Sequence, residues 1–300
     1  MVDRIKENGV IRCGAVPRPG LVGFSPDRRA ASGLYLDLCR AIGAALLPPE
    51  GRIEFRAYDS DRAFDRIRSG ADDLAFLDGS EILDQNLAGQ IVPGPPVVFL
   101  STGAMAPEDS PIRGLGDLAG KSVCFCQGSN AHRNLEASMA ARRLDFVRKG
   151  FTEYGELYDA YDARVCDAAV GEIGDLAVAR LQAKTPKSRI LTESFATFPV
   201  LAVTPVADPQ WSAIVAWAVY ALERAGLAAG PWNASGLASL PPEAPALGLS
   251  DGWQARVVGA AGTYADIYAR NLGARSPLNL PRGANAPLEA GGLFATPYRE

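Results

Sequence analysis

Short apolar strands alternate with amphipathic helices from the start of this chain, and this alternation restricts its fold more than any other feature. Strands are predicted at residues 11–16, 52–57 and 74–77, with helices at 34–47 and 62–69 between them. A βαβαβ order of this kind predicts a doubly wound, mainly parallel sheet covered by helices. The first hundred residues are therefore expected to form one α/β lobe.

A second α/β lobe is predicted after a crossing segment at 97–104. Its expected strands are 121–126, 148–152, 165–170 and 189–191, and its helices begin near residue 131 and span 159–163 and 175–182. A return crossing at 198–206 and a helix at 209–225 follow. Residues 226–300 are rich in Gly, Pro and Ala, but Trp232, Trp253, Tyr264, Tyr268 and Phe294 are too many aromatic residues for a solvated linker. This segment is expected to wrap around the first lobe.

Composition excludes several classes of protein. The 300 residues are 48% apolar and carry a net charge of −4, so the chain can bury a large core and shows no electrostatic footprint for nucleic acid. No apolar run approaches the ~20 residues that span a bilayer. The N-terminus lacks the apolar region of a signal peptide, which indicates a cytosolic protein or a mature form with an added methionine.

The five cysteines leave two interpretations open. Cys13 lies in the first strand and Cys39 in the helix after it, while Cys124 and Cys126 share one face of a later strand. In an oxidised chain Cys13 could pair with Cys39, and Cys166 with either Cys124 or Cys126. In the other interpretation all five are reduced, buried side chains. With a single histidine and no Cys-x-x-Cys pair, no metal site is expected.

The run at 165–176, Val-Cys-Asp-Ala-Ala-Val-Gly-Glu-Ile-Gly-Asp-Leu, reads as a strand that leads directly into a helix. Ligands bind at such carboxyl ends in open α/β sheets. The run resembles the Cys-Asp-Ala-x-x-x-Asp-x-x-x-Leu segment of periplasmic amino-acid-binding proteins of ABC importers. Further pieces occur in the order seen in the general amino-acid-binding members, among them Cys13-Gly14, Gly23-Phe24-Ser25, Gly120-Lys121-Ser122, Gln210-Trp211, Gly262-x-Tyr264 and Arg282-Gly283-x-Asn285.

This resemblance implies a two-lobe periplasmic binding protein fold (type II) with a C-terminal extension. Lobe 1 would comprise 1–100 and 204–300, including the extension at 226–300, and lobe 2 would comprise 101–203. Two crossing strands would join the lobes, and a small-molecule ligand would lie in the cleft that closes by a hinge motion. The resemblance further implies a periplasmic monomer without a cofactor that serves an ABC transporter permease.

Proteins of this family bind a zwitterion, with an arginine and backbone N–H groups on the carboxylate and an acid on the ammonium. Here Gln85 stands where the arginine is expected, and Glu172 replaces the aspartate. The turn Gly128-Ser129-Asn130 opens a helix and is expected to offer N–H groups to an anion. Arg18, in a proline-restricted loop, is the first candidate for the missing charge, with Arg133 and Lys121 as further candidates.

The expected ligand-binding residues come from both lobes, and His132 is expected to be a surface residue. Phe24 is interpreted either as a stacking partner of the ligand or as a core aromatic. The full set is Arg18, Phe24, Asp78, Ser80, Gln85, Lys121, Gly128, Ser129, Asn130, Arg133 and Glu172.

These departures predict a solute-binding protein whose ligand is not an ordinary α-amino acid. One candidate is an anionic polycarboxylate such as a quinone cofactor of the pyrroloquinoline quinone type. The alternatives are a conventional amino-acid-binding protein and a degenerate binding-protein fold that acts as a partner of a redox enzyme or a receptor. Catalysis is not expected, because the single histidine, His132, would have to meet a nucleophile and no Gly-x-Ser-x-Gly or nucleotide-binding loop is present.

Overall fold

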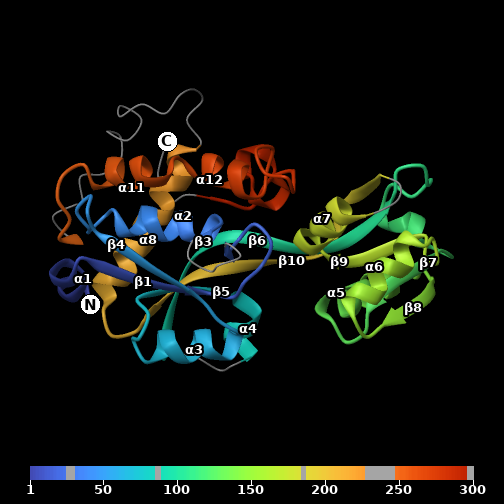
Figure 1. Ribbon diagram of the computed structural model, residues 1–300, viewed down its shortest axis with the longest axis horizontal. Helices are drawn as coiled ribbons and strands as arrows, with labels where there is room; N and C mark the ends of the chain where they lie inside the picture. Colours follow the sequence, from blue (N-terminus) through green and yellow to red (C-terminus); the bar gives the residue numbers. More distant parts are fainter. Residues whose placement is uncertain (25–30, 85–88, 184–186, 227–246, 296–300) are drawn as a thin grey trace. The chain divides into compact units, whose positions relative to one another are not determined.

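The chain divides into two units. The computed structural model describes residues 1–24, 31–84, 89–183, 187–226 and 247–295 (Figure 1). Unit 1 comprises Met1–Phe99 with Pro199–Glu300, and unit 2 comprises Leu100–Phe198. Each unit is a mainly parallel sheet with helices on its faces, which confirms the predicted α/β fold class.

In unit 1 the sheet is centred on β1 (Val10–Ala15), which pairs in parallel with β4 (Arg52–Ala57) and β5 (Leu74–Asp78). All five residues of β5 are buried, as expected for a strand covered on both faces. α2 (Leu34–Gly43) covers one face, with α11 (Trp253–Ala261) and α12 (Tyr264–Asn271) packed on its outer side, and α3 (Ser60–Arg68) and α4 (Gly79–Asp84) cover the other (Figure 1). The remaining elements of this unit are α1 (Val2–Asn8), the short strands β2 (Gly23–Phe24) and β3 (Ala31–Ser32), η2 (Gly283–Asn285) and η3 (Leu288–Ala290).

The long helix α8 (Pro209–Ala225) has the start predicted from the sequence. Asp208 caps it by accepting a hydrogen bond from the Trp211 N–H at 3.0 Å, and Pro209 stands at its first position. The Trp211 ring is fully buried, and its Nε1 donates to the Asp73 carbonyl at 2.6 Å. This helix therefore ties the segment after the second crossing to the sheet of unit 1.

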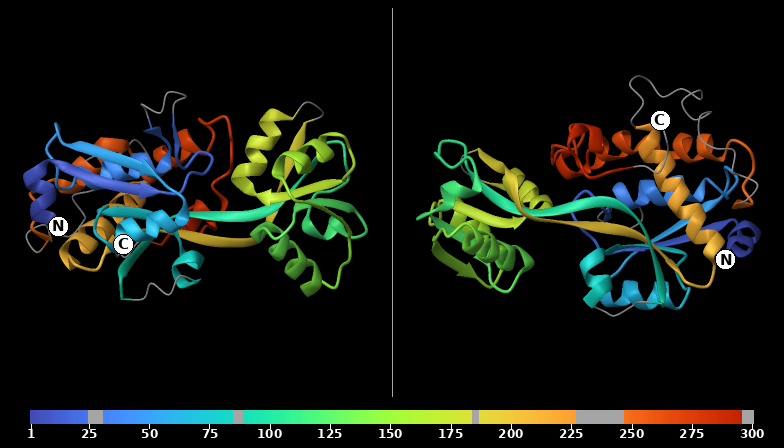
Figure 2. Two further views of the ribbon diagram at one scale, coloured as in Figure 1. Left: turned by 60° about the horizontal axis from the view of Figure 1, so that its bottom comes forward. Right: turned by 180° about the vertical axis from the view of Figure 1, so that it is seen from behind.

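Two long strands, β6 (Ile91–Pro107) and β10 (Ser188–Pro205), each run from one unit into the other and lie side by side (Figure 2). The sequence predicted shorter pieces at 97–104, 189–191 and 198–206. The strands continue through prolines at 93, 95, 96 and 199, because proline fits extended backbone and removes only one donor per residue. The separate strands at 189–191 and 198–206 are wrong, because they belong to one continuous strand.

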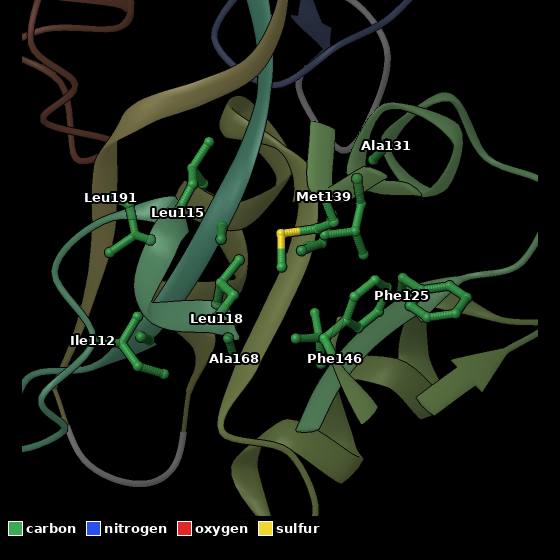
Figure 3. Close-up of a cluster of buried hydrophobic side chains, with 14 residues drawn as sticks. Ile112, Leu115, Leu118, Phe125, Ala131, Met139, Phe146, Ala168 and Leu191 are labelled. Carbon is green, nitrogen blue, oxygen red and sulfur yellow. The ribbon is translucent and has the colours of Figure 1, made fainter. Parts of the chain in front are cut away.

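In unit 2, β7 (Ser122–Cys126) pairs in parallel with β8 (Val147–Phe151) and β9 (Ala168–Glu172). Alternate residues of β7 face opposite layers. Val123 and Phe125 pack with Leu135 and Met139 of α5 (Asn130–Ala141) and with η1 (Leu115–Leu118) (Figure 3). Cys124 and Cys126 instead face α6 (Tyr154–Asp162) and α7 (Ile173–Gln182).

The strand predicted at 165–170 starts three residues too early. β9 begins at Ala168, and Val165 is 50% exposed because its N–H closes the turn after α6 by donating to Ala160. The strand continues to Glu172, which is also the residue that precedes α7. Glu172 therefore lies at the carboxyl end of a strand, as the ligand-site hypothesis requires.

Two disulfides cross-link the chain, one in each unit. Cys13 is bonded to Cys39 in unit 1, and Cys124 to Cys166 in unit 2, while Cys126 is a buried thiol. The oxidised interpretation is confirmed with Cys124 as the partner of Cys166, and the fully reduced one is wrong. None of the helices in the described part of the chain combines the length and apolar character needed to cross a bilayer.

Candidate ligand-binding site

In unit 1, Arg18, Asp78 and Ser80 come together at the carboxyl ends of β1 and β5. Arg18 Nη2 lies 3.9 Å from Asp78 Oδ2, and the Asp78 side chain is only 5% exposed. Asp78 Oδ1 accepts hydrogen bonds from the Ser80 N–H at 2.8 Å and from Ser80 Oγ at 2.7 Å, and so holds the start of α4. The positive charge of Arg18 therefore faces a buried carboxylate.

The loop that carries Arg18 is fixed on both sides. The Arg18 carbonyl accepts hydrogen bonds from the N–H groups of Leu21 and Val22, each at 3.1 Å. Gly20 has φ +72°, and a Cβ at this position would lie 2.6 Å from Leu272 of the C-terminal extension. Phe24, which is 39% exposed on β2, is not a core aromatic.

In unit 2, the turn before α5 is held by its own side chains. Ser129 caps the helix by accepting from the His132 N–H at 3.1 Å, and its hydroxyl donates to the Cys126 carbonyl at 2.8 Å. The Gly128 N–H donates to His132 Nδ1 at 3.2 Å, while the imidazole stacks on Phe125 at 4.2 Å. His132 is thus a structural partner of the turn as well as a partly exposed residue.

Arg133 folds back over this turn. Its Nη1 donates to the Gly128 carbonyl at 2.6 Å, and its Nη2 donates to Asn130 Oδ1. Gly128, Asn130 and Arg133 are all exposed. The guanidinium and the positive end of the α5 dipole lie on the same exposed turn, which suits a negatively charged ligand group.

Glu172 lies beside the crossing strand and α5. In the register of β6 with β9 it is paired with Thr102, whose side chain is fully buried. Thr102 Oγ1 accepts from Asn134 Nδ2 of α5 at 3.1 Å. Glu172 is half-buried at the end of β9, in the same unit as the turn at Ser129.

Two stacked tyrosines of α6, Tyr154 and Tyr158, lie near Glu172 and Asp175, with ring centroids 6.4 Å apart. Burial raises the pKa of the Tyr158 hydroxyl, and Asp175 raises it further. Burial likewise raises the pKa of Tyr154, which also interacts with Ser129 and with both acids. The Tyr158 hydroxyl has no hydrogen-bond partner among the described residues. Both rings therefore stay neutral at ordinary pH beside the acids.

One of the expected ligand residues, Lys121, is not brought to these positions. Lys121 precedes β7, whereas Gly128 follows it, so the five-residue strand separates them by about 16 Å. Burial opposes ionisation of Asp167, but hydrogen bonds from Ser122 and the charge of Lys121 outweigh it and lower the pKa of Asp167. Gln85 lies outside the described residues.

Sequence reasoning missed Thr102, Asn134, Tyr154 and Tyr158. A usable signal existed for the tyrosines, because their spacing of four residues places both on one face of a helix. No such signal existed for Thr102, whose position depends on pairing between strands distant in the sequence. No group of three or more potential metal ligands occurs among the described residues.

Each unit presents its own set of candidate binding groups. Unit 1 offers an arginine paired with a buried aspartate, and an exposed phenylalanine. Unit 2 offers a helix start with an arginine, and carboxylates beside neutral tyrosines. Carboxylates and aromatic faces bind ammonium groups, whereas helix N-termini and arginines bind carboxylates.

Comparisons with known proteins give relatives along nearly the whole chain. No family model matches it. The general L-amino acid-binding periplasmic protein AapJ of Rhizobium johnstonii is 27% identical, covering 98% of this chain and 92% of the relative. The glutamate/glutamine/aspartate/asparagine-binding protein BztA of Rhodobacter capsulatus is 26% identical over 99% and 93%. A solved ABC transporter periplasmic binding protein from Brucella ovis, with glutathione bound, has a TM-score of 0.74 at 24% identity and covers 98% of this chain and 97% of that one.

Proposed function

We propose that the chain is a solute-binding protein of the amino-acid ABC importer family and captures an amino-acid-like solute in the periplasm for the importer's permease. In this proposal Glu172 binds the ammonium group of the solute. The observation that carries it is the place of Glu172 at the carboxyl end of β9, beside two neutral tyrosines. Such a role involves binding without catalysis and needs one copy of the chain.

The surroundings of Glu172 suit a cation. A half-buried carboxylate attracts an ammonium group more strongly than a fully solvated one, because solvent screens the charges less. Tyr154 is 42% exposed and interacts electrostatically with Glu172, and an aromatic face near the carboxylate adds a cation–π contribution. The turn at Gly128 and Ser129, with Arg133, supports binding of the solute's carboxylate.

The arginine contacts favour an amine-bearing solute over a polycarboxylate. The buried Asp78 offsets part of the charge of Arg18, and the turn at Gly128 and Asn130 occupies two of the donors of Arg133. A polyanionic quinone would have to compete for both groups. α-Amino acids and glutathione, by contrast, carry an α-ammonium group, and the named ligands of the relatives are of this type.

The test is a titration of the purified protein, stripped of bound solute by partial unfolding, against a ligand panel. The panel holds the twenty amino acids, glutathione, di- and tricarboxylates and a carboxylated quinone, with Trp fluorescence and melting temperature as readouts. A ligand at 100 times its Kd stabilises the native state by about 2.7 kcal/mol. We expect binding by an amine-bearing member of the panel.

The variant that tests the site is Glu172→Gln, which keeps the side-chain shape and removes the charge. Loss of a charge-assisted hydrogen bond should weaken binding by about tenfold to a hundredfold. Glu156→Gln, at an exposed position on α6, is the matched control and should bind as the native protein does.

Equal affinity of native protein and Glu172→Gln would refute the assignment. Binding of polycarboxylates alone would refute the solute class, and no binding by any panel member would favour a protein-partner role.

A further inference from the structure

Asn285 of the C-terminal extension is bonded to the crossing strand β6 at the boundary of the units. Its Oδ1 accepts from the Phe99 N–H at 2.7 Å, and its Nδ2 donates to the Phe99 carbonyl at 2.8 Å. Phe99 is the last residue of the first segment of unit 1, and unit 2 begins at Leu100. One buried amide therefore satisfies both backbone groups of the residue at which the strand leaves unit 1.

The same strand has a different partner just beyond this point. β9 pairs with β6 from Thr102 to Met105. On the unit 1 side of the boundary, the Asn285 side chain thus makes the two hydrogen bonds that a residue of a neighbouring strand would make. Leu100 and Ser101 lie between the two attachments, and Ser101 Oγ lies 2.8 Å from Thr197 Oγ1 of β10.

Asn285 is itself held rigidly. Arg282 Nε and Nη2 donate to the Asn285 carbonyl at 3.0 and 2.7 Å, and the Arg282 guanidinium lies 5.4 Å from the centre of the Tyr264 ring. Phe294 packs edge-on against Phe99 at 5.1 Å and against Tyr264 at 4.8 Å. Bonds and rings therefore fix both the amide and its target.

The extension is anchored to the body of unit 1 at a separate place. Asp37 Oδ2 of α2 accepts from Arg270 Nε and from Asn271 Nδ2 of α12, each at 2.7 Å. The contacts at Phe99 are thus connected through α12 to α2. Through α2 they are connected to the sheet of unit 1. The extension connects the body of this unit with the start of the crossing strand.

We propose that Asn285 is a positioning residue that anchors Phe99, so that any movement of the units during solute capture is absorbed by β6 beyond Phe99. The reason is that hinge residues must change φ and ψ, and a residue bonded at both its N–H and its C=O resists this change. The proposal rests on the proposed function only in linking such movement to solute capture. The anchoring itself needs no solute and can be measured without one.

The variant is Asn285→Ala, and its matched control is Asn271→Ala. Asn271 belongs to the same extension and also makes two side-chain hydrogen bonds, to Asp37 at 2.7 Å and to the Ile267 carbonyl at 2.9 Å, but it does not touch β6. The first readout is amide hydrogen exchange in solute-free protein. Asn285→Ala should accelerate amide exchange at Phe99 by about tenfold. Asn271→Ala should accelerate exchange at Phe99 only as much as its general loss of stability predicts.

The second readout separates anchoring from a merely structural hydrogen bond. Spin labels on cysteines introduced by Glu50→Cys in unit 1 and Arg143→Cys in unit 2, both at exposed sites, report the distribution of distances between the units. Asn285→Ala should broaden this distribution and Asn271→Ala should not. Arg282→Gln, which leaves the Asn285 amide in place but removes its support, should give an intermediate width. Equal widths for all variants, or equal broadening by Asn271→Ala, would overturn the proposal whatever the protein binds.

Discussion

Glu223 of α8 is a carboxylic acid buried where the C-terminal extension docks. Its side chain is 6% exposed, and Oε1 has no hydrogen-bond partner among the described residues. Burial raises the pKa of Glu223 from 4.5 to about 8, and the opposing charge of Arg282 offsets only part of this. Tyr220 and Tyr264 also face the acid. The folded protein therefore holds a proton that the unfolded chain releases above pH 4.5.

We predict that Glu223→Gln stabilises the protein at neutral pH. Because the folded pKa is raised, native stability falls as pH rises from about 4.5 to about 8 and is then constant. At pH 7 the variant should be more stable by about 3 kcal/mol, and the difference should vanish near pH 4.5. Urea unfolding at pH 4.5, 7 and 8.5 measures this, with the exposed Glu289→Gln as control. A difference independent of pH would contradict the account.

At the scale of elements, the sequence predicted most strands and helices of the two units, because each has an apolar period and clear end signals. β4 has the predicted range 52–57, and α8 has the predicted range 209–225. The start of β9 was misplaced because Val165 and Cys166 are apolar but lie in the connection between α6 and β9. In the candidate site, residues at the carboxyl ends of strands, such as Asp78 and Glu172, could be found. Thr102 and Asn285 could not, since their roles depend on pairings between segments far apart in the chain.

The attachment of α12 to α2 gives an element-scale prediction. Asp37 is 13% exposed and receives Arg270 and Asn271, so Asp37→Ala leaves a part-buried guanidinium and an amide without their acceptor. The free energy of unfolding should fall by about 2 kcal/mol, and unit 1 should melt several degrees lower. Calorimetry measures the shift. Asp65→Ala removes an exposed pair with Arg68 and should cost less than about 1 kcal/mol. Equal losses would show that Asp37 does not anchor the extension.

At the scale of the molecule, each unit has its own core, and each disulfide closes a loop within one unit. The Cys124–Cys166 bond spans 42 residues of unit 2, and the Cys13–Cys39 bond spans 26 residues of unit 1. Loop-closure entropy gives about 4 and about 3.5 kcal/mol for the two bonds. Because only the strands β6 and β10 continue through the boundary between the units, we expect each disulfide to stabilise its own unit alone.

Replacing one disulfide at a time tests this independence. In Cys124→Ala with Cys166→Ala, Cys126 is the last thiol of unit 2, so no alternative disulfide can form there. Hydrogen exchange at equilibrium should accelerate in residues 100–198 and stay unchanged in the core strands β1 and β5. Cys13→Ala with Cys39→Ala should give the opposite pattern. If either pair of substitutions accelerated exchange equally in both units, the two units would unfold as one cooperative body, since the loss of a local constraint would then be shared through the crossing strands.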